Sequence, residues 1–479
     1  MSWCRDVGIV CPALTIRVEN GQRGLFATRN ITPGEDLICI PRKACLISAA
    51  TDTEAPPMEV LHGLSRTFWS DAPWHLRLSV LLIDQQLAGA TSKFHAYVSA
   101  LPADPTCVLW AYETYGRTSV IPSLSRYHMD MPADLYHKLI KSRYQRFRRA
   151  LPKHLQHSMS LKNFCWSLSN VASRAFAIPP PQLSSCNTLQ FALLPMLDMA
   201  NASTHAPTRI RFDRENQMIR VATGASYRAG DQVYVSYGSK SNDDFMFFYG
   251  FVEGDNPANS VTITDFREWV LRLAYRVSPV CDSWDRKLKV LRDAGVLHPD
   301  KTFSFSMDKL DESLLFVLRI TLATPCQLET YQEETKRSSS KKFITIDLGN
   351  ELAVWQAVRE KCEALLRELP PFTAEEHNTL GRILGRCPCT AAWDFTRPQS
   401  EGEVLYRYER GRVLRGTIER VAHFAQVSKS VGRICTVLLP PSQQLLRAEH
   451  FHFAQKETGT ADIRMFEISP QNIEEFLSE

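Results

Sequence analysis

The sequence predicts an α+β protein in which a β-rich domain is interrupted by a helical insert and followed by a helical region. Two changes of apolar period carry this prediction. Short apolar runs separated by turn residues fill residues 14–47, a helical period then replaces them, and the strand pattern returns over residues 210–237. After about residue 262 the apolar spacing is helical almost throughout. We therefore expect both strand-bearing segments to meet in one β-rich core.

These changes of period also set the expected domain boundaries. The chain of 479 residues is long enough for about three domains. We expect a β-rich domain over residues 10–262 with its helical insert at about 49–159, a separate helical domain over 263–440, and a tail of mixed composition over 441–479.

Turn residues delimit the expected strands. The segments 21–24 and 32–34 contain the glycines and the proline that are typical of turns, and segment 228–230 does the same in the second half. The strands expected between such turns cover residues 14–18, 25–27, 37–40, 210–212, 218–221 and 232–237.

Start and stop signals delimit the expected helices. The run Asp71-Ala72-Pro73 begins one helix that Gly89 ends, and Thr373 with Glu376 forms a capping box at the start of another. Gly295 fits the C-terminal cap of a third helix. The expected helices cover residues 74–87, 134–151, 161–176, 265–277, 283–294, 308–323, 350–369, 373–385 and 400–427.

Composition argues against several functional classes. The net charge of +4, from 56 basic and 52 acidic residues, is too small to indicate a nucleic-acid partner. No run of 18 apolar residues is present, so we expect no transmembrane helix and no membrane partner. Thirteen cysteines, an odd number, and an N-terminus without a signal-peptide pattern indicate a reducing cytoplasmic or nuclear compartment. Cys387 and Cys389 lack a second pair at zinc-ligand spacing, so we expect no metal site.

Four segments carry residues suited to chemistry, at residues 20–29, 173–176, 194–203 and 235–251. The fourth places the hydroxyls of Tyr237 and Tyr249 among several aromatic rings, and such a lining favours an apolar channel with a polar end. Taken alone, rings in this pattern more often belong to an ordinary aromatic core.

In this order the four segments resemble the SET-domain protein methyltransferases of the Rubisco large-subunit methyltransferase class. That class combines a glycine turn, an arginine segment, a Pro-x-x-Asp-x-x-Asn-His-Ser loop and a Tyr-Gly…Tyr-Gly-Phe segment. The likeness extends to the insert through residues 92–102 and to the helical domain through residues 406–414. It implies a SET fold with a knot-like C-terminal part, S-adenosylmethionine as cofactor, and a protein substrate bound by the separate all-α domain.

The resemblance also implies roles for individual residues. Those matching cofactor-binding positions are Arg23, Gly24, Leu25, Arg174, Asn201, Ala202 and Tyr249. The catalytic positions match Tyr249 and Tyr237, and the substrate channel matches Phe176, Tyr237 and Phe251. Ala202 stands where the class has histidine, so backbone contacts there are expected to persist while the contacts of the ring are lost.

The function implied by the resemblance is protein-lysine N-methylation of a histone or non-histone substrate. The lysine amine must first lose its proton, against a reference pKa of about 10.4, and a dry aromatic channel favours the neutral amine. Protein-histidine methylation is one alternative, although the actin-histidine relatives carry asparagine where this chain has Phe176 and lack a match to Tyr249. A non-catalytic SET scaffold that binds a protein partner is the other, because Ala202 replaces the class histidine.

Overall fold

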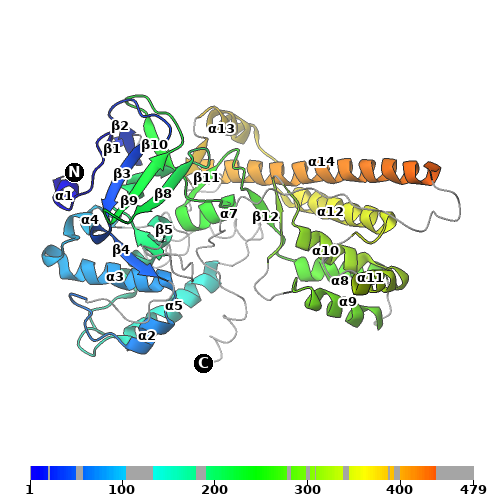
Figure 1. The fold of residues 1–479 in the computed structure, drawn as a ribbon, viewed down its shortest axis with the longest axis horizontal. Helices are drawn as coiled ribbons and strands as arrows, with labels where there is room; N and C mark the ends of the chain where they lie inside the picture. Colours follow the sequence, from blue (N-terminus) through cyan, green and yellow to red (C-terminus); the bar gives the residue numbers. More distant parts are fainter. Residues whose placement is uncertain are drawn as a thin grey trace.

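A computed structural model gives the arrangement of the chain (Figure 1). It describes residues 2–19, 22–49, 58–103, 133–179, 190–277, 282–297, 302–307, 309–337, 345–386, 389–392 and 400–438. The predicted tail over 441–479 and Cys387 lie outside the described residues. The boundaries proposed for the insert and the helical domain stay predictions.

The β-rich domain contains three small sheets, each of which joins strands from the two ends of the predicted 10–262 domain (Figure 1). The first has the order β1 (Leu14–Glu19), β2 (Gln22–Ala27), β10 (Gln232–Val235) and β7 (Asn201–Ala202). The second has the order β3 (Asp36–Pro41), β9 (Met218–Thr223) and β8 (Thr208–Asp213). The third has the order β4 (Leu46–Ala49), β6 (Gln190–Leu193) and β5 (Ala175–Ile178). The two strand-bearing segments therefore meet in one core, as the sequence predicts.

Helix α6 (Leu161–Arg174) ends earlier than expected, and this places a predicted site residue on a different element. The sequence analysis assigned Phe176 to the end of the helix, whereas the structure places it in β5, opposite Ala192 of β6. The reason is that residues 175–178 alternate between partly exposed and buried positions. Pairing with β6 therefore buries both Phe176 and Ile178.

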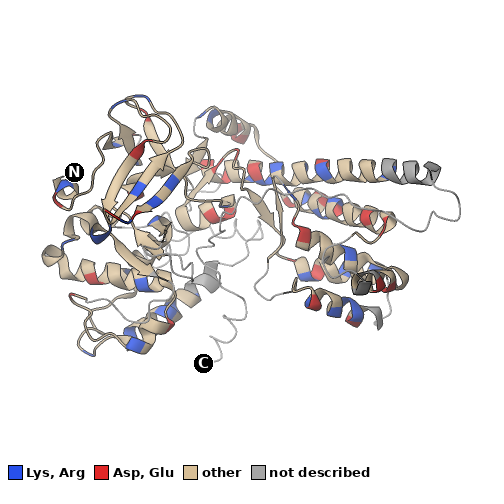
Figure 2. Ribbon diagram, viewed as in Figure 1, with Lys and Arg blue, Asp and Glu red and all other residues tan. Residues whose placement is uncertain are grey.

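The insert packs against the third sheet mainly through Trp74–Ala88, which contacts β4 and β6. Its helices are α2 (Arg66–Asp71), α3 (Trp74–Ala88), α4 (His95–Ala100) and α5 (Ala133–Ala150). Trp74 begins α3 after the predicted Pro73 and stacks on Phe191 of β6 at a centroid distance of 3.9 Å. Helix α5 is rich in basic residues (Figure 2), and two of them make contacts within the fold. Arg146 pairs with Asp71, and Arg148 donates a hydrogen bond to the carbonyl of Gln156.

The C-terminal region is helical, with additions that the sequence did not reveal. Its helices are α8 (Phe266–Val277), α9 (Asp282–Asp293), α10 (Glu312–Leu322), α11 (Pro325–Arg337), α12 (Leu348–Glu368), α13 (Ala374–Leu384) and α14 (Glu401–Leu438). Helix α11 was not expected, and neither were two strands of three residues, β13 (Ser304–Ser306) and β14 (Thr390–Ala392). These strands pair with β12 (Ser260–Thr262) and β11 (Phe251–Glu253), respectively. Strands this short contain too few residues to show a period of two.

Helix α14 belongs to two hydrophobic cores. Val404, Leu405 and Tyr406, near its start, pack in the same cluster as the β-rich domain. Val413, Leu414 and Val421, farther along, pack in the cluster formed by the C-terminal helices. In Figure 1 the helix runs from the region of β11 across the helical region, so it connects the two parts of the molecule.

Because α14 packs in both hydrophobic cores, we predict that shortening a buried side chain of α14 in either core destabilises the protein. Leu405→Ala and Leu414→Ala each remove a side chain that is fully buried, one in each core. Each is expected to lower the free energy of unfolding by about 2–5 kcal/mol. Chemical unfolding followed by circular dichroism measures the change. Val427→Ala, at a position 38% exposed on the same helix, is the control and should change stability by less than about 0.5 kcal/mol. A neutral Leu405→Ala variant would contradict the shared-core description.

Candidate active site

Strands β2, β10 and β7 form one wall of the site. Strand β10 pairs antiparallel with β2 and parallel with β7, so the backbone of residue 24 lies close to Asn201. A Cβ atom on Gly24 would lie 3.2 Å from Nδ2 of Asn201 and 2.3 Å from Nε2 of Gln232. Glycine at position 24 therefore permits a close backbone approach that no other residue could make without moving these amides.

Leu25 has a different role from its neighbours. Its side chain is fully buried in the core, and its backbone lies between Ile16 of β1 and Val233 of β10. It therefore anchors β2, and it presents no side chain to the surface of the site.

A buried polar cluster lies behind this wall. Arg174, the last residue of α6, donates from Nη1 to the carbonyl oxygen of Asp198 at 2.6 Å. The Asp198 carboxyl accepts a hydrogen bond from the hydroxyl of Tyr97 at 2.8 Å. Arg23 reaches the insert from β2 and donates to the carbonyl of Ala100 at 2.7 Å. Among the described residues, Oδ1 of Asp198 and Nε of Arg174 are buried and have no hydrogen-bond partner.

The electrostatics of this cluster follow from burial. Burial raises the pKa of Asp198 to about 6, against the opposing effects of Arg174, the Tyr97 hydrogen bond and Arg23. Burial likewise lowers the pKa of Arg23, and the positive charge of Arg174 adds to this effect. Arg174 and Arg23 thus act on the Asp198 carboxyl through their charges while they donate to backbone carbonyls, and two positive charges beside one carboxyl favour an added anion such as a carboxylate.

The second part of the site is aromatic. Tyr237 follows β10, and its ring contacts Phe176 edge to face at a centroid distance of 6.0 Å and Tyr249 at 5.1 Å. Its hydroxyl donates to the carbonyl oxygen of Ala200 at 2.8 Å. Because Ala200 directly precedes Asn201, this bond ties the aromatic rings to the loop beside the glycine wall.

Tyr249 ends a π-helical turn, η8 (Phe245–Tyr249), that follows the short helix α7 (Asn242–Asp244). Gly250 then adopts a positive φ of 73°, a conformation that glycine reaches without strain, and the chain enters β11. Phe251 lies 6.3 Å from the Tyr249 ring. Burial, together with Tyr237 and Asp244, raises the pKa of Tyr249, so its hydroxyl keeps its proton at neutral pH.

Glu253 forms hydrogen bonds with both parts of the site. Its buried carboxylate accepts hydrogen bonds from the hydroxyl of Ser203 and from the backbone N–H of Thr204. Its backbone exchanges two hydrogen bonds with the side-chain amide of Asn242 at the start of α7. The loop that carries Asn201 and the turn that carries Tyr249 are therefore held by the same residue.

The structure thus brings the predicted residues together and adds others that sequence reasoning missed. Apart from Leu25, whose side chain belongs to the core, the predicted residues lie along the glycine wall, the polar cluster and the aromatic group. The additions are Tyr97, Asp198, Asn242 and Glu253. Asp198 had a visible signal, since it lies within the loop motif of residues 194–203. Tyr97 lies in residues 92–102, which are part of the resemblance, but its contact with Asp198 spans 101 positions of sequence and had no local signal.

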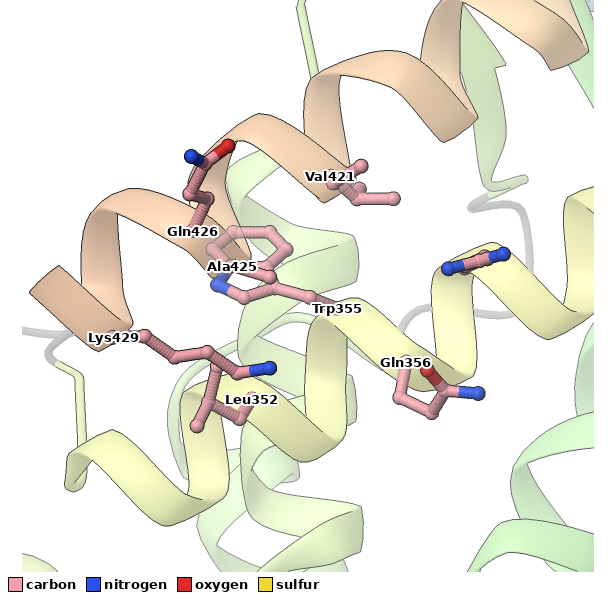
Figure 3. Close-up of a pocket in the computed structure, with 9 residues that line it drawn as sticks. Leu352, Trp355, Gln356, Val421, Ala425, Gln426 and Lys429 are labelled. Carbon is pink, nitrogen blue, oxygen red and sulfur yellow. The ribbon is translucent and has the colours of Figure 1, made fainter.

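A pocket elsewhere in the molecule does not coincide with this site. It has a volume of about 420 Å³ and is lined only by residues of α12 and α14, among them Trp355, Val421 and Lys429 (Figure 3). None of its lining residues was selected by the sequence analysis. Within the described ranges, no group of three His, Cys, Asp or Glu side chains could hold a metal ion, and no helix has the length and apolar character of a membrane span.

The raised pKa of Asp198 predicts a specific pH dependence of stability. The folded-state pKa of Asp198 lies above the usual Asp value of 3.8, so ionisation of Asp198 lowers stability, and the slope of stability against pH carries a downward contribution from Asp198 between about 3.8 and about 6. The difference corresponds to about 3 kcal/mol. Asp198→Asn should flatten this slope, which denaturant unfolding at a series of pH values measures. Asp71→Asn, a surface change, is the matched control and should keep the slope of the parent. Equal slopes in the parent and Asp198→Asn would contradict the prediction.

A family model and several curated relatives match parts of the chain. Residues 283–382 match the family model described as Rubisco LSMT substrate-binding. The chain is 24% identical over 386 residues to the actin-histidine N-methyltransferase of Drosophila melanogaster, covering 76% of this chain and 68% of that protein. It is 25% identical over 305 residues to SET domain-containing protein 4 of Homo sapiens, covering 62% and 66%. The human actin-histidine N-methyltransferase is 23% identical, and 58% of its length is covered. The chain thus spans about three fifths to two thirds of these relatives.

Solved structures with the same fold include Rubisco LSMT. The structure of the SET domain of LSMT bound to lysine and AdoHcy matches with a TM-score of 0.60 and 18% identity, covering 90% of this chain and 91% of that one. Rubisco LSMT bound to AdoMet matches with a TM-score of 0.58 and 19% identity, over 90% and 92%. The chain is thus similar to SET-domain methyltransferases in fold, and part of its C-terminal region is similar to the substrate-binding domain of Rubisco LSMT.

Proposed function

We propose that this protein is an S-adenosylmethionine-dependent protein-lysine N-methyltransferase. The observation that carries the proposal is the contact of Tyr237 with both halves of the site. Its ring packs against Phe176 and Tyr249, and its hydroxyl binds the carbonyl next to Asn201. An aromatic group suited to a side-chain amine is thereby joined to a polar wall suited to a charged cofactor.

The residues of the wall fit the cofactor. The buried Nε of Arg174 has no partner among the described residues and can donate to the cofactor carboxylate, with Arg23 adding positive charge. Gly24 allows the backbone of β2 to approach a ligand, and the Asn201 amide lies next to it. When bound, S-adenosylmethionine supplies a methyl group activated by a sulfonium.

The aromatic residues would prepare the amine. Rings at Phe176, Tyr237 and Tyr249 exclude water, which lowers the pKa of a lysine amine and favours the neutral nucleophile. The protonated hydroxyl of Tyr249 can orient the nitrogen, because burial keeps its pKa high. Alignment of the amine with the methyl group then provides much of the rate.

Histidine methylation is the second candidate, and the names of the actin-histidine relatives favour it. Lysine is supported by Phe176 and Tyr249, positions at which the resemblance distinguishes this chain from the actin-histidine enzymes. The scaffold alternative rests on Ala202. Its backbone lies opposite Val235 in the β7–β10 pair, which leaves the local strand geometry intact without the histidine ring.

The decisive experiment incubates the purified protein with labelled S-adenosylmethionine and a native proteome. Mass spectrometry of the labelled protein then identifies the modified residue. Methyl-lysine supports the proposal, and methyl-histidine replaces it with the second candidate. Isothermal titration with the cofactor is run in parallel, because absence of binding at millimolar concentration would support the scaffold.

We propose a cytoplasmic or nuclear location and a protein substrate that engages the C-terminal domain.

Tyr249→Phe should separate binding from chemistry. Loss of the hydroxyl is expected to lower kcat about 100-fold, while the Kd of the cofactor changes little, because the group acts near the transition state. Single-turnover rates and cofactor titration measure the two effects. Tyr144→Phe, which removes a hydroxyl bound to the carbonyl of Met159 in the insert, is the control. A Tyr249→Phe variant with the kcat of the parent would move the assignment to Tyr237.

Ala202→His should show whether the site has adapted to the smaller residue. Ala202 is 5% exposed, so a ring at this position must displace its neighbours. We expect a loss of about 1–3 kcal/mol in stability from overpacking, without tighter cofactor binding. The melting temperature and the cofactor Kd measure both outcomes, with His205→Ala at an exposed position of the same loop as control. An unchanged melting temperature with tighter binding would mean that space for the ring persists.

A further inference from the structure

The C-terminal helix α14 contacts the turn that carries Tyr249. The hydroxyl of Tyr406 donates to Oδ1 of Asp243 at 2.5 Å, and Nη1 of Arg410 lies 3.9 Å from the same oxygen. Arg410 also donates to the Tyr406 hydroxyl at 3.4 Å. Asp243 belongs to α7, the helix that leads directly into the π-helical turn. The side chains of Tyr406 and Arg410 are buried and that of Asp243 is 16% exposed, so these contacts are largely shielded from water.

A second contact from the same helix holds the other end of the segment. The backbone N–H of Asp255 donates to Oε1 of Glu409 at 3.3 Å. Arg412 pairs with both carboxylates, at 2.6 Å from Asp255 and 2.9 Å from Glu409. Asp255 has a positive φ of 56°, a strained conformation for a residue with a side chain, and these contacts hold it in place.

These two contacts enclose residues 243–255, which contain Tyr249. We call them the α14 clamp, formed by Tyr406 and Arg410 on Asp243 and by Glu409 and Arg412 on Asp255. Inside the segment, the π-helical turn is a rare conformation that depends on support from its surroundings. The pairing of β11 with β14 adds a backbone tie from the same C-terminal region.

We propose that the α14 clamp positions Tyr249 for methyl transfer, with Tyr406 as its key positioning residue. This inference rests on the proposed function, because it assigns a role in that reaction. Tyr406 acts through Asp243 and the π-helical turn, and the element that aims the site tyrosine therefore belongs to the C-terminal region rather than to the β-rich domain.

The test compares Tyr406→Phe with the parent, using the substrate identified by proteome labelling. Phenylalanine keeps the ring in the core and removes only the bond to Asp243. We expect kcat to fall about 10- to 100-fold, because a misplacement of about 1 Å is costly, while KM and cofactor Kd stay within about twofold. Tyr144→Phe is the matched control and should keep the parent kcat. Asp243→Asn retains an acceptor oxygen for Tyr406 and should keep most of the activity, whereas Asp243→Ala should not.

A double-variant cycle identifies the route of the effect. If Tyr406 acts through Tyr249, Tyr406→Phe should lower kcat much less in the Tyr249→Phe background than in the parent. Additive effects, or a Tyr406→Phe variant that loses thermal stability but keeps the parent kcat, would overturn the proposal.

Hydrogen exchange tests the clamp without any reaction. Peptides covering residues 243–255 should exchange faster in Tyr406→Phe than in the parent or in Tyr144→Phe, with peptides from β8 and β9 unchanged. Unchanged exchange in 243–255 would overturn the clamp. Faster exchange in a protein that labels no substrate would instead show that the clamp exists and that the proposed methyltransferase function is wrong.

Discussion

Much of the structure depends on one constraint, which is that helix α14 is buried in two hydrophobic cores at once. Its first turns complete the core of the β-rich domain, and its middle completes the core of the C-terminal helices. Arg407 and Glu409 lie on α14 between these two groups of residues, and both are buried. Arg407 pairs with Glu376 of α13, and Glu409 pairs with Arg412. Removing one partner would leave a buried charge uncompensated, so the two domains are joined by contacts that are costly to break.

The candidate site lies where three chain segments meet on this frame. The glycine wall comes from β2, the loop with Asp198 and Asn201 follows β6, and the aromatic turn precedes β11. Glu253 ties the loop to the turn, while Tyr97 reaches Asp198 from the insert. The cost of burying Asp198 is reflected in its raised pKa, and Arg174 and Tyr97 offset part of it. Among the residues that the structure describes, Oδ1 of Asp198 has no hydrogen-bond partner, so an unsatisfied polar atom lies where a charged ligand is expected.

Helix α14 also forms one side of the pocket between α12 and α14. It lies about 15 to 23 residues beyond Tyr406, which corresponds to roughly 22–35 Å along a helix. A single continuous helix thus borders this pocket, shown in Figure 3, and carries the clamp residues that contact the Tyr249 segment.

Sequence by itself determined the return of the β pattern after the insert, most of the longer helices and the strands bounded by clear turns, and the resemblance supplied most of the candidate site residues. Those features depend on local period, on turn residues and on short motifs, which lie in neighbouring positions. Only the tertiary structure decided that Phe176 lies on a strand, that Tyr97 reaches Asp198, and that Tyr406 holds the turn of Tyr249. Tyr97 and Asp198 are 101 positions apart and Asp243 and Tyr406 are 163 positions apart, and no local pattern encodes which distant polar groups will be buried together.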